Sequence, residues 1–343
     1  MVNIFDVAKK ADVSIATVSR AFNHTGVVKE EKRNRVLKIA NELGYSPSLV
    51  ARTMRTNISG YVCLVLPKID LPIFTRVIEG VEDYLYGVRY NLIIANIDNK
   101  LDRLKTQFDI FKNRKIDGII YCSLGFDDSE LEILRNFMKS ENIPLVFVDR
   151  IMPEINSPYV INDNFSGAYT AAKYLIGKGH KKIIVIYSTP EAYTTKKRME
   201  GFKAAFKENG ISDNLNLYFL VKDISLGSGY DAAKQIFSSK SKATAIFCFT
   251  DILALGVLKY TQDNNISIPN KISLMGYDDI EFSAISYPPL TTIHQKKYML
   301  GYHAAEIIIK TIELRKKSKN YKSRKRVILK PYLVERKSVS DIT

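Results

Sequence analysis

The sequence has no long hydrophobic run and no secretory leader at its start. A transmembrane helix needs about 18 or more consecutive apolar residues, and no run in this chain approaches that length. The first residues, 1–6, lack the positively charged and apolar regions of a signal peptide. The sequence therefore predicts a cytoplasmic protein without a membrane partner.

The chain also has few cysteines and lacks several common enzyme motifs. The three cysteines, Cys63, Cys122 and Cys248, lie in apolar runs, so we expect buried, reduced thiols and no disulfide framework. No GxGxxG opens a helix, and neither a Walker sequence nor a GxSxG elbow occurs. The four histidines show no metal-ligand spacing. We expect no catalytic residue, no metal and no cofactor.

What the chain does have is length and an uneven positive charge. Its 343 residues, 46% apolar and 25% charged, are typical of a globular protein with two or three domains. The formal charge is +15. Residues 1–59 carry 10 Lys and Arg against five Asp and Glu, and residues 310–337 carry 12 against two. A basic head on a nearly neutral body is typical of nucleic-acid binding, whereas we expect the second basic run to be a solvated loop.

The basic head predicts three short helices. Residues 4–11 place apolar side chains at helical spacing, and Ser14 is a suitable N-cap for a second helix over 15–23. Two short helices joined by such a turn form a helix-turn-helix, whose second helix fits the major groove of DNA. A third helix is expected over about 30–43, with Gly44 after its end.

From Ser59 onward, apolar runs alternate with amphipathic helices, which predicts parallel sheets covered by helices on both faces. The strands expected are 61–66, 92–95, 118–121, 145–148, 183–186, 218–221, 245–249 and 273–276. The helices expected include 101–113, 128–138, 165–177, 196–208, 227–237 and 251–263. The fold class is therefore α/β, with a helix-turn-helix headpiece and two doubly wound lobes that hold a ligand between them.

The amino-acid sequence of the head resembles that of a known family. The residues that carry the match are Asp6-Val7-Ala8, Val13-Ser14, Thr17-Val18-Ser19-Arg20, Asn23, Leu43-Gly44-Tyr45-Ser46-Pro47 and Val50-Ala51-Arg52. Together they resemble the headpiece of the lactose/galactose-repressor family. The resemblance implies a headpiece over 1–46, a hinge helix or linker over 47–58, and a two-lobed body like the periplasmic sugar-binding proteins. We assign 59–161 with 293–321 to the first lobe and 162–292 with 322–343 to the second.

The resemblance also implies that the head binds a double-stranded DNA operator. The residues expected there are Ile15, Ala16, Thr17, Ser19, Arg20, Asn23, Ala51, Arg52 and Met54. Arg20 can grip O6 and N7 of guanine, so we expect it to be the main base reader. Ile15 and Ala16 have no donors and can only touch thymine methyl groups or leave room. Thr17, Ser19 and Asn23 are expected on phosphates, although Thr17 is equally well a plain helix-surface residue. Met54 takes the place of the family's wedging leucine.

The body resembles the same family along nearly its whole length, with matches at 148–150, 162–164, 177–180, 198–202, 250–251, 254–256, 276–279 and 290–295. By that resemblance an effector is bound by Phe74 from the first lobe and by Arg198 and Asp278 from the second. Further expected contacts are Asp149, Thr250 and Gln295. Without the family, Asp278 could simply end a strand and Arg198 could be a surface charge.

The chemistry of this set suits a sugar. Carboxylates accept hydroxyl hydrogen bonds, arginine donates several, and an aromatic face covers the C–H side of a ring. Thr250 stands where asparagine is commoner, and Ile224 stands about where purine-responsive relatives use an aromatic residue, which disfavours a purine. Asp163 and Asp251 are expected to cap helices.

The function expected is a transcriptional repressor of a carbohydrate-utilisation operon that a small sugar releases from DNA. The alternatives are a regulator that needs a purine or a partner protein, a sugar-binding module without a DNA role, or an enzyme on the same fold. No apolar heptad tail follows the strand-like segment near 327–333, so we expect a homodimer on a pseudo-palindromic operator.

Overall fold

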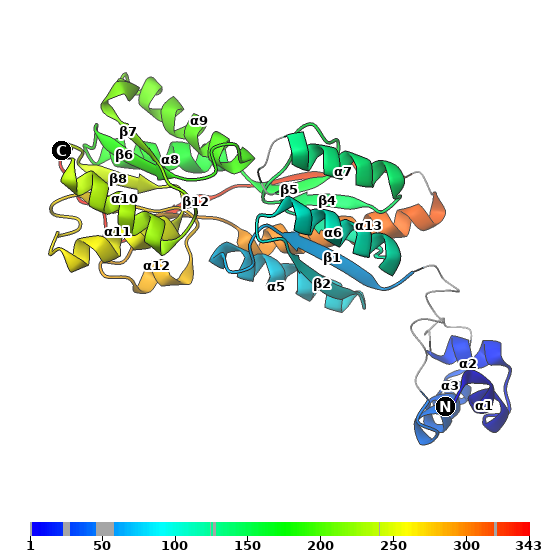
Figure 1. Cartoon of the computed structure of the whole chain (residues 1–343). Coiled ribbons are helices and arrows are strands. Elements are labelled where there is room, and N and C mark those ends of the chain that lie inside the picture. Colours follow the sequence, from blue (N-terminus) through cyan, green and yellow to red (C-terminus); the bar gives the residue numbers. More distant parts are fainter. Residues whose placement is uncertain are drawn as a thin grey trace. The chain divides into compact units, whose positions relative to one another are not determined.

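The computed structural model describes residues 2–22, 28–45, 58–123, 125, 128–239, 241–318 and 321–343. The chain divides into two compact units, Met1–Gly60 and Tyr61–Thr343 (Figure 1). None of the helices in the described part of the chain is long and apolar enough to span a bilayer.

The first unit contains the three predicted helices, α1 (Ile4–Lys10), α2 (Ile15–Phe22) and α3 (Glu30–Glu42). They enclose a small core of Val7, Ala8, Ala11, Val18, Ala21, Val36 and Ala40. Asn3 begins α1 with a capping box, in which its side chain accepts from the backbone near Asp6 and Asp6 accepts from the backbone of Asn3. After α3, Gly44 has φ +65, which glycine adopts without strain.

The first lobe of the second unit is built on a parallel sheet of six strands in the order β11-β5-β4-β3-β1-β2. These strands are β1 (Tyr61–Leu66), β2 (Asn91–Asn96), β3 (Gly118–Tyr121), β4 (Leu145–Val148), β5 (Tyr159–Asn162) and β11 (Arg326–Leu329). Helices α5 (Pro72–Gly87) and α13 (Lys297–Lys317) pack on one face of the sheet. Helices α6 (Leu101–Arg114) and α7 (Asp128–Ser140) pack on the other.

The second lobe has a four-stranded parallel sheet in the order β7-β6-β8-β9. Its strands are β6 (Ile183–Tyr187), β7 (Leu217–Leu220), β8 (Ala245–Cys248) and β9 (Ser273–Met275). Helices α8 (Asn164–Gly177) and α9 (Tyr193–Glu208) cover one face, and α10 (Leu226–Ser238) and α11 (Asp251–Asp263) cover the other. The lobe also holds the 3-10 helix η1 (Asp213–Leu215) and the short helix α12 (Glu281–Ile285). The predicted α/β class is confirmed.

The chain crosses between the lobes after β5, after β10 (Thr292–His294) and between β11 and β12 (Tyr332–Val334). Two of these crossings are joined, because Lys296 N donates to Asn162 Oδ1 at 3.2 Å. β10 pairs antiparallel with β12.

The expected lobe boundaries need a correction. The assignment of 322–343 to the second lobe is wrong in part, because β11 pairs with β5 in the first-lobe sheet and residues 326–329 therefore belong to the first lobe. The return crossing was expected at residue 293, whereas His294 still bridges to Asp278 of the second lobe. Local sequence pattern marks where a strand forms, but it does not say which sheet the strand joins.

Candidate nucleic-acid interface and ligand cavity

Helix α2 presents a polar and an apolar side that match the predicted orientation of a recognition helix. Val18 and Ala21 are fully buried, whereas Ile15, Ala16 and Arg20 are exposed. Amphipathic spacing therefore leaves the three side chains expected to face base edges free of the helical core.

The start of α2 is capped as predicted. Ser14 Oγ accepts from Thr17 N at 3.2 Å, and the Ser14 and Thr17 hydroxyls lie 2.9 Å apart. Thr17 is half-buried, and so is Ser19. Thr17 thus already serves the helix cap, while its side chain keeps a partly exposed edge.

Helix α3 fixes the position of α2 by bonding to its end. Arg33 Nε donates to the carbonyl of Ala21 at 3.1 Å, which satisfies one of the carbonyls left over at a helix C-terminus. The rings of Phe22 and Tyr45 pack edge to face with centroids 5.9 Å apart. The exposed face of α2 is therefore held on a rigid support. Asn23, Ala51, Arg52 and Met54, which we also expected at DNA, lie outside the described residues.

A cavity opens between the two lobes of the second unit, at the carboxyl ends of their strands. The empty space within it, with the solvent at its mouth included, is about 590 Å³. It is lined by Leu71, Pro72, Ile73, Asp149, Arg150, Ser188, Thr189, Thr194, Thr195, Arg198, Ile224, Phe249, Thr250, Ile252, Asp278 and Ile280. Four predicted effector residues, Asp149, Arg198, Thr250 and Asp278, therefore meet at one site.

Arg198 is the best-anchored side chain of the cavity. It projects from α9, is only 6% exposed, and its Nε donates to Asn164 Oδ1 at 2.8 Å. Its guanidinium also donates to the carbonyl of Phe249 and stacks over the ring of Tyr277, 3.8 Å from the centroid. The remaining amine lies 3.5 Å from Asp278 Oδ1. A buried arginine held so firmly is a preorganised donor, and it is not the surface charge that its helical position alone would suggest.

Asp278 lies just beyond β9, with φ 119, in a region that side-chain-bearing residues rarely adopt. Gln295 Nε2 donates to its Oδ1 at 2.6 Å. Burial raises the pKa of Asp278 to about 7, against the opposing effect of the positive charge on Arg198. The group can therefore exchange a proton near neutral pH.

Asp149 mirrors this arrangement in the first lobe. It follows β4, has φ 62 and is 3% exposed. Burial raises the pKa of its carboxyl group, while the charges of Arg150 and Arg198 act in the opposite direction. Its Oδ1 has no hydrogen-bond partner, and neither does Nε of the adjacent Arg150. Unpartnered buried polar atoms are costly in a folded protein, so these two point to a ligand or solvent that completes them.

Two of the expected effector residues do not line the cavity. Phe74 is fully buried in the first-lobe core between the sheet and α13, and its neighbour Ile73 reaches the wall instead. The helical stripe placed Phe74 correctly as a core residue, so its assignment as a direct contact is corrected. Gln295 is fully buried behind the wall, where it supports Asp278.

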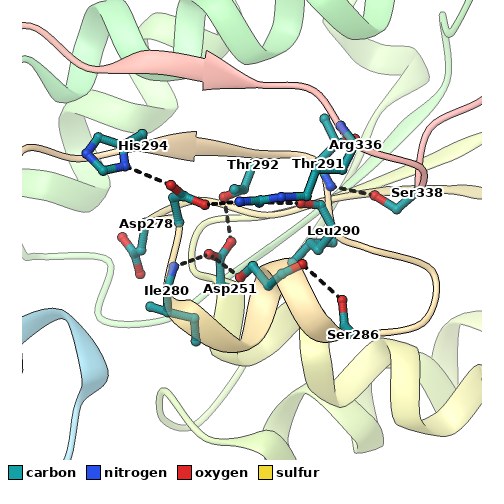
Figure 2. A network of polar contacts seen from close by, with 12 residues as sticks. Asp251, Asp278, Ile280, Ser286, Leu290, Thr291, Thr292, His294, Arg336 and Ser338 are labelled. Atoms are coloured by element: carbon teal, nitrogen blue, oxygen red, sulfur yellow. Dashed lines mark hydrogen bonds and ion pairs between the residues drawn. The ribbon is translucent and has the colours of Figure 1, made fainter.

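A buried network holds the loop that carries Asp278, and its centre is Asp251 (Figure 2). Asp251 accepts from Ile280 N at 3.0 Å, from the Ser283 hydroxyl at 2.7 Å and from the Thr292 hydroxyl at 2.6 Å. We expected Asp251 to cap its helix, but the cap of α11 is Thr250, which accepts from Leu253 N. Asp251 instead ties three segments of the second lobe together.

The next residue along the loop is fixed from the other side. Asp279 accepts from His294 Nδ1 at 2.7 Å and from Arg336 at 2.6 Å. Burial alone would raise the pKa of Asp279, but these hydrogen bonds and the charge of Arg336 lower it to about 2. The loop between β9 and α12 is therefore pinned by charge-assisted bonds, which position Asp278 at the cavity.

Several lining residues escaped the sequence analysis. Arg150, Ser188, Thr189, Thr194 and Thr195 all reach the wall. Ser188 and Thr189 follow β6, and the position just after a parallel strand was the available signal for them. In the described ranges, no group of three or more His, Cys, Asp or Glu could hold a metal ion.

Comparisons with known proteins identify the family to which the chain belongs. Residues 59–336 match the family model of periplasmic binding proteins and the sugar-binding domain of the LacI family, and residues 3–48 match bacterial regulatory proteins of the lacI family. The chain belongs to the LacI family. The HTH-type transcriptional repressor PurR of Photobacterium profundum is 36% identical over 100% of both chains. PurR of Pasteurella multocida is 34% identical over 99% of both.

Solved structures agree with the fold of this LacI-family chain. The lac repressor dimer bound to operator and the anti-inducer ONPF has a TM-score of 0.85, at 22% identity over 99% of both chains. A LacI-family regulator from Enterococcus faecium with bound ribose has a TM-score of 0.70, at 27% identity over 82% of this chain and 100% of that one. The chain is a DNA-binding transcriptional repressor of the LacI family.

Proposed function

We propose that this repressor is controlled by a small polyhydroxylated effector of the sugar class, which binds between the two lobes. The observation that carries the proposal is the meeting of Asp149, Arg198 and Asp278 in one buried wall. Carboxylates accept hydrogen bonds from hydroxyl groups, and a fixed guanidinium donates hydrogen bonds to ring or hydroxyl oxygens. A neutral polyol satisfies both without bringing an unpaired charge into the cavity.

The orphaned atoms support the same chemistry. Asp149 Oδ1 accepts no hydrogen bond, and Arg150 Nε donates none, although Arg150 Nε lies 3.9 Å from Asp149 Oδ2 in an ion pair. A hydroxyl group is both donor and acceptor, so one polyol can complete the two atoms. The Enterococcus faecium relative that binds ribose, at 27% identity, is in line with this choice.

The alternative effector is a purine, and the name PurR of the curated relatives favours it. A planar base is usually covered by an aromatic face. Among the described lining residues only Phe249 is aromatic, and Ile224 occupies the wall where we expected purine-responsive relatives to carry a ring. The composition of the wall therefore supports the sugar over the purine.

On DNA, the proposal assigns base reading to Arg20, with Ile15 and Ala16 beside it on α2. Thr17, Ser19 and Asn23 would hold phosphates, and Ala51, Arg52 and Met54 would act in the minor groove. A homodimer would place two such units on a pseudo-palindromic operator. The dimer in the lac repressor structure is a property of that protein, and it supports the same assembly here. A repressor bound to bacterial DNA would act in the cytoplasm.

The test is a thermal-shift screen of the full chain with ribose, other pentoses, hexoses and purine bases. A specific binder present at about 100 times its dissociation constant stabilises the protein by about 2.7 kcal/mol. We expect a sugar to give this shift and Asp278→Asn to remove it. The matched control is Asp231→Asn on the exposed surface of α10, which should keep the shift.

A shift with purine bases and none with sugars would reject the proposed effector while leaving the repressor role intact. A shift that survives Asp278→Asn would show that the ligand binds elsewhere. For a positive ligand, release of operator DNA on addition would establish induction, and tighter DNA binding would establish corepression.

A further inference from the structure

The first lobe carries a group of exposed cations that the effector site does not use. They lie at the end of α13, in the loop after it and at the start of β11, and we call them the basic edge: Lys316, Lys317, Lys322, Arg324, Lys325 and Arg326. All six are exposed. In the part of the chain that the structure describes, no Asp or Glu forms an ion pair with any of them. The patch therefore carries six positive charges on exposed side chains.

The basic edge is fixed to the sheet beneath it. Arg315 Nε donates to the carbonyl of Tyr321 at 3.0 Å, and another amine of Arg315 donates to the carbonyl of Asn142 at 2.6 Å. Tyr159 N donates to the carbonyl of Lys325 at 3.1 Å, and Arg326 stacks over the Tyr159 ring at 5.5 Å. These contacts tie the end of α13, the end of the loop and the Arg326 side chain to the rest of the first lobe.

The basic edge lies at the end of the first lobe where the chain enters the second unit. All strands of this sheet are parallel, so the starts of β1 and β11 lie at the same end of the sheet. Tyr61 at the start of β1 is where the chain arrives from the first unit, and the end of α13 lies at the same end of the lobe (Figure 1). Four strand spacings separate β1 from β11, which is about 19 Å. The linking segment, residues 46–60, spans at most about 50 Å when fully extended.

We propose that the basic edge is a second contact surface for duplex DNA, which binds the phosphate backbone beside the segment held by the head. The inference goes beyond the effector response and rests on DNA binding alone. Duplex DNA carries one negative charge per about 1.7 Å, so a duplex that meets this edge as well as the head offers it dense negative charge. Six exposed cations match that charge without reading sequence.

Helix electrostatics accounts for only part of the patch. Cations in the last turn of a helix offset its dipole, which explains Lys316 and Lys317 on α13. Lys322, Arg324 and Lys325 lie in the loop beyond the helix and Arg326 begins the strand, where no helix end requires them. Charged side chains also protect an edge strand, but of the six cations only Arg326 lies in β11.

The test measures binding of the full chain to a generic duplex of about 40 base pairs across a salt series. The variant replaces all six basic-edge cations by Gln. The matched control replaces six exposed lysines of the second lobe, none of which has an ion pair with a described residue: Lys181, Lys182, Lys207, Lys234, Lys242 and Lys271. Both variants lower the net charge equally, and thermal unfolding checks that both are folded.

Each cation that meets a phosphate contributes about 0.9 to the slope of log affinity against log salt. We expect the basic-edge variant to lose about 2 or more of this slope, and to bind at least tenfold more weakly at low salt, while the control stays within about 1 of the wild type. Equal loss in both variants would show a general charge effect and would overturn the proposal. An unchanged slope in the basic-edge variant would also overturn the proposal. If that variant with an unchanged slope lost binding to anionic lipid vesicles, the partner of the basic edge would be a membrane surface and not DNA.

Discussion

At the scale of single residues, the cavity depends on two aspartates in backbone conformations that side-chain-bearing residues rarely adopt. Asp149 has φ 62 and directly follows β4, and Asp278 has φ 119 and lies three residues beyond the end of β9. Such strain is kept where the surrounding structure fixes it, and it occurs often at functional sites. Here the bonds of Asp251 and Asp279 fix the loop of the second lobe, so the carboxylate of Asp278 is aimed before any ligand arrives.

The raised pKa of Asp278 predicts a pH-dependent stability. Its pKa is about 7 in the folded protein and near 4 when unfolded, so between these values the folded state holds one more proton. The free energy of unfolding attributable to this group therefore falls as pH rises from about 4 to about 7. Urea unfolding of the wild type and of Asp278→Asn should show the wild type relatively more stable at pH 5 than at pH 8. An equal difference at both pH values would contradict the assignment.

We expect Arg20 to determine which operator sequence is preferred, and not only how tightly DNA is bound. Arg20→Ala should cost about 1–3 kcal/mol at one base position of each half-site and relax the preference there. Ser19→Ala, on the same helix, should weaken all sequences alike if Ser19 holds a phosphate. Binding to a library of operator variants distinguishes the two, and uniform weakening by Arg20→Ala would show that it does not read a base.

At the scale of elements, the pattern of apolar and polar residues along the chain was sufficient to predict most of the helices and strands. The strands at 61–66, 118–121 and 145–148 and the helix at 251–263 have the predicted bounds, because each is an apolar run with clear turn signals at its ends. β5 is not among the predicted strands, because its sequence Tyr-Val-Ile-Asn is short, ends in a polar residue and follows an irregular loop. Local pattern also cannot assign β11 to a sheet or place Phe74 behind the wall, since both depend on contacts between distant segments.

The pairing of α5 with α13 predicts a sharp contrast between two glycines. A Cβ at Gly80 would lie 2.1 Å from the carbonyl oxygen of Tyr298, whereas a Cβ at Gly87 would meet nothing within 4 Å. Gly80→Ala should therefore destabilise the protein by about 1–3 kcal/mol through overpacking. Gly87→Ala should be neutral or stabilising by about 0.5 kcal/mol, because it lowers the entropy of the unfolded chain. Urea unfolding of both variants measures the difference, and equal effects would contradict this close approach.

The segment 46–58 gives a prediction that follows from its sequence. It is too short to be a stable helix alone, since isolated helices below about 12–15 residues are marginal in water. We therefore expect its order to depend on a dimer partner and on DNA. Met54→Gly should greatly weaken operator binding and leave effector affinity of the free protein unchanged. Equal operator affinity, or equally fast hydrogen exchange at 48–56 with and without DNA, would contradict this role.

At the scale of the whole molecule, the two lobes are joined by crossings of the chain. The crossings after β5 and before α13 are hydrogen-bonded to each other, because Lys296 N donates to Asn162 Oδ1 at 3.2 Å. A ligand shifts DNA binding only by the difference in its affinity for the two states of the protein. By linkage, DNA must change effector affinity by the same factor.

The most direct test of the account is the affinity of the effector for the full chain, measured with and without saturating operator DNA. If a sugar in the interlobe cavity releases the repressor, operator must weaken sugar binding, by the same factor by which sugar weakens operator binding. Couplings of this kind are typically about 5–150-fold. Equal effector affinity with and without operator would contradict the claim that this cavity controls DNA binding.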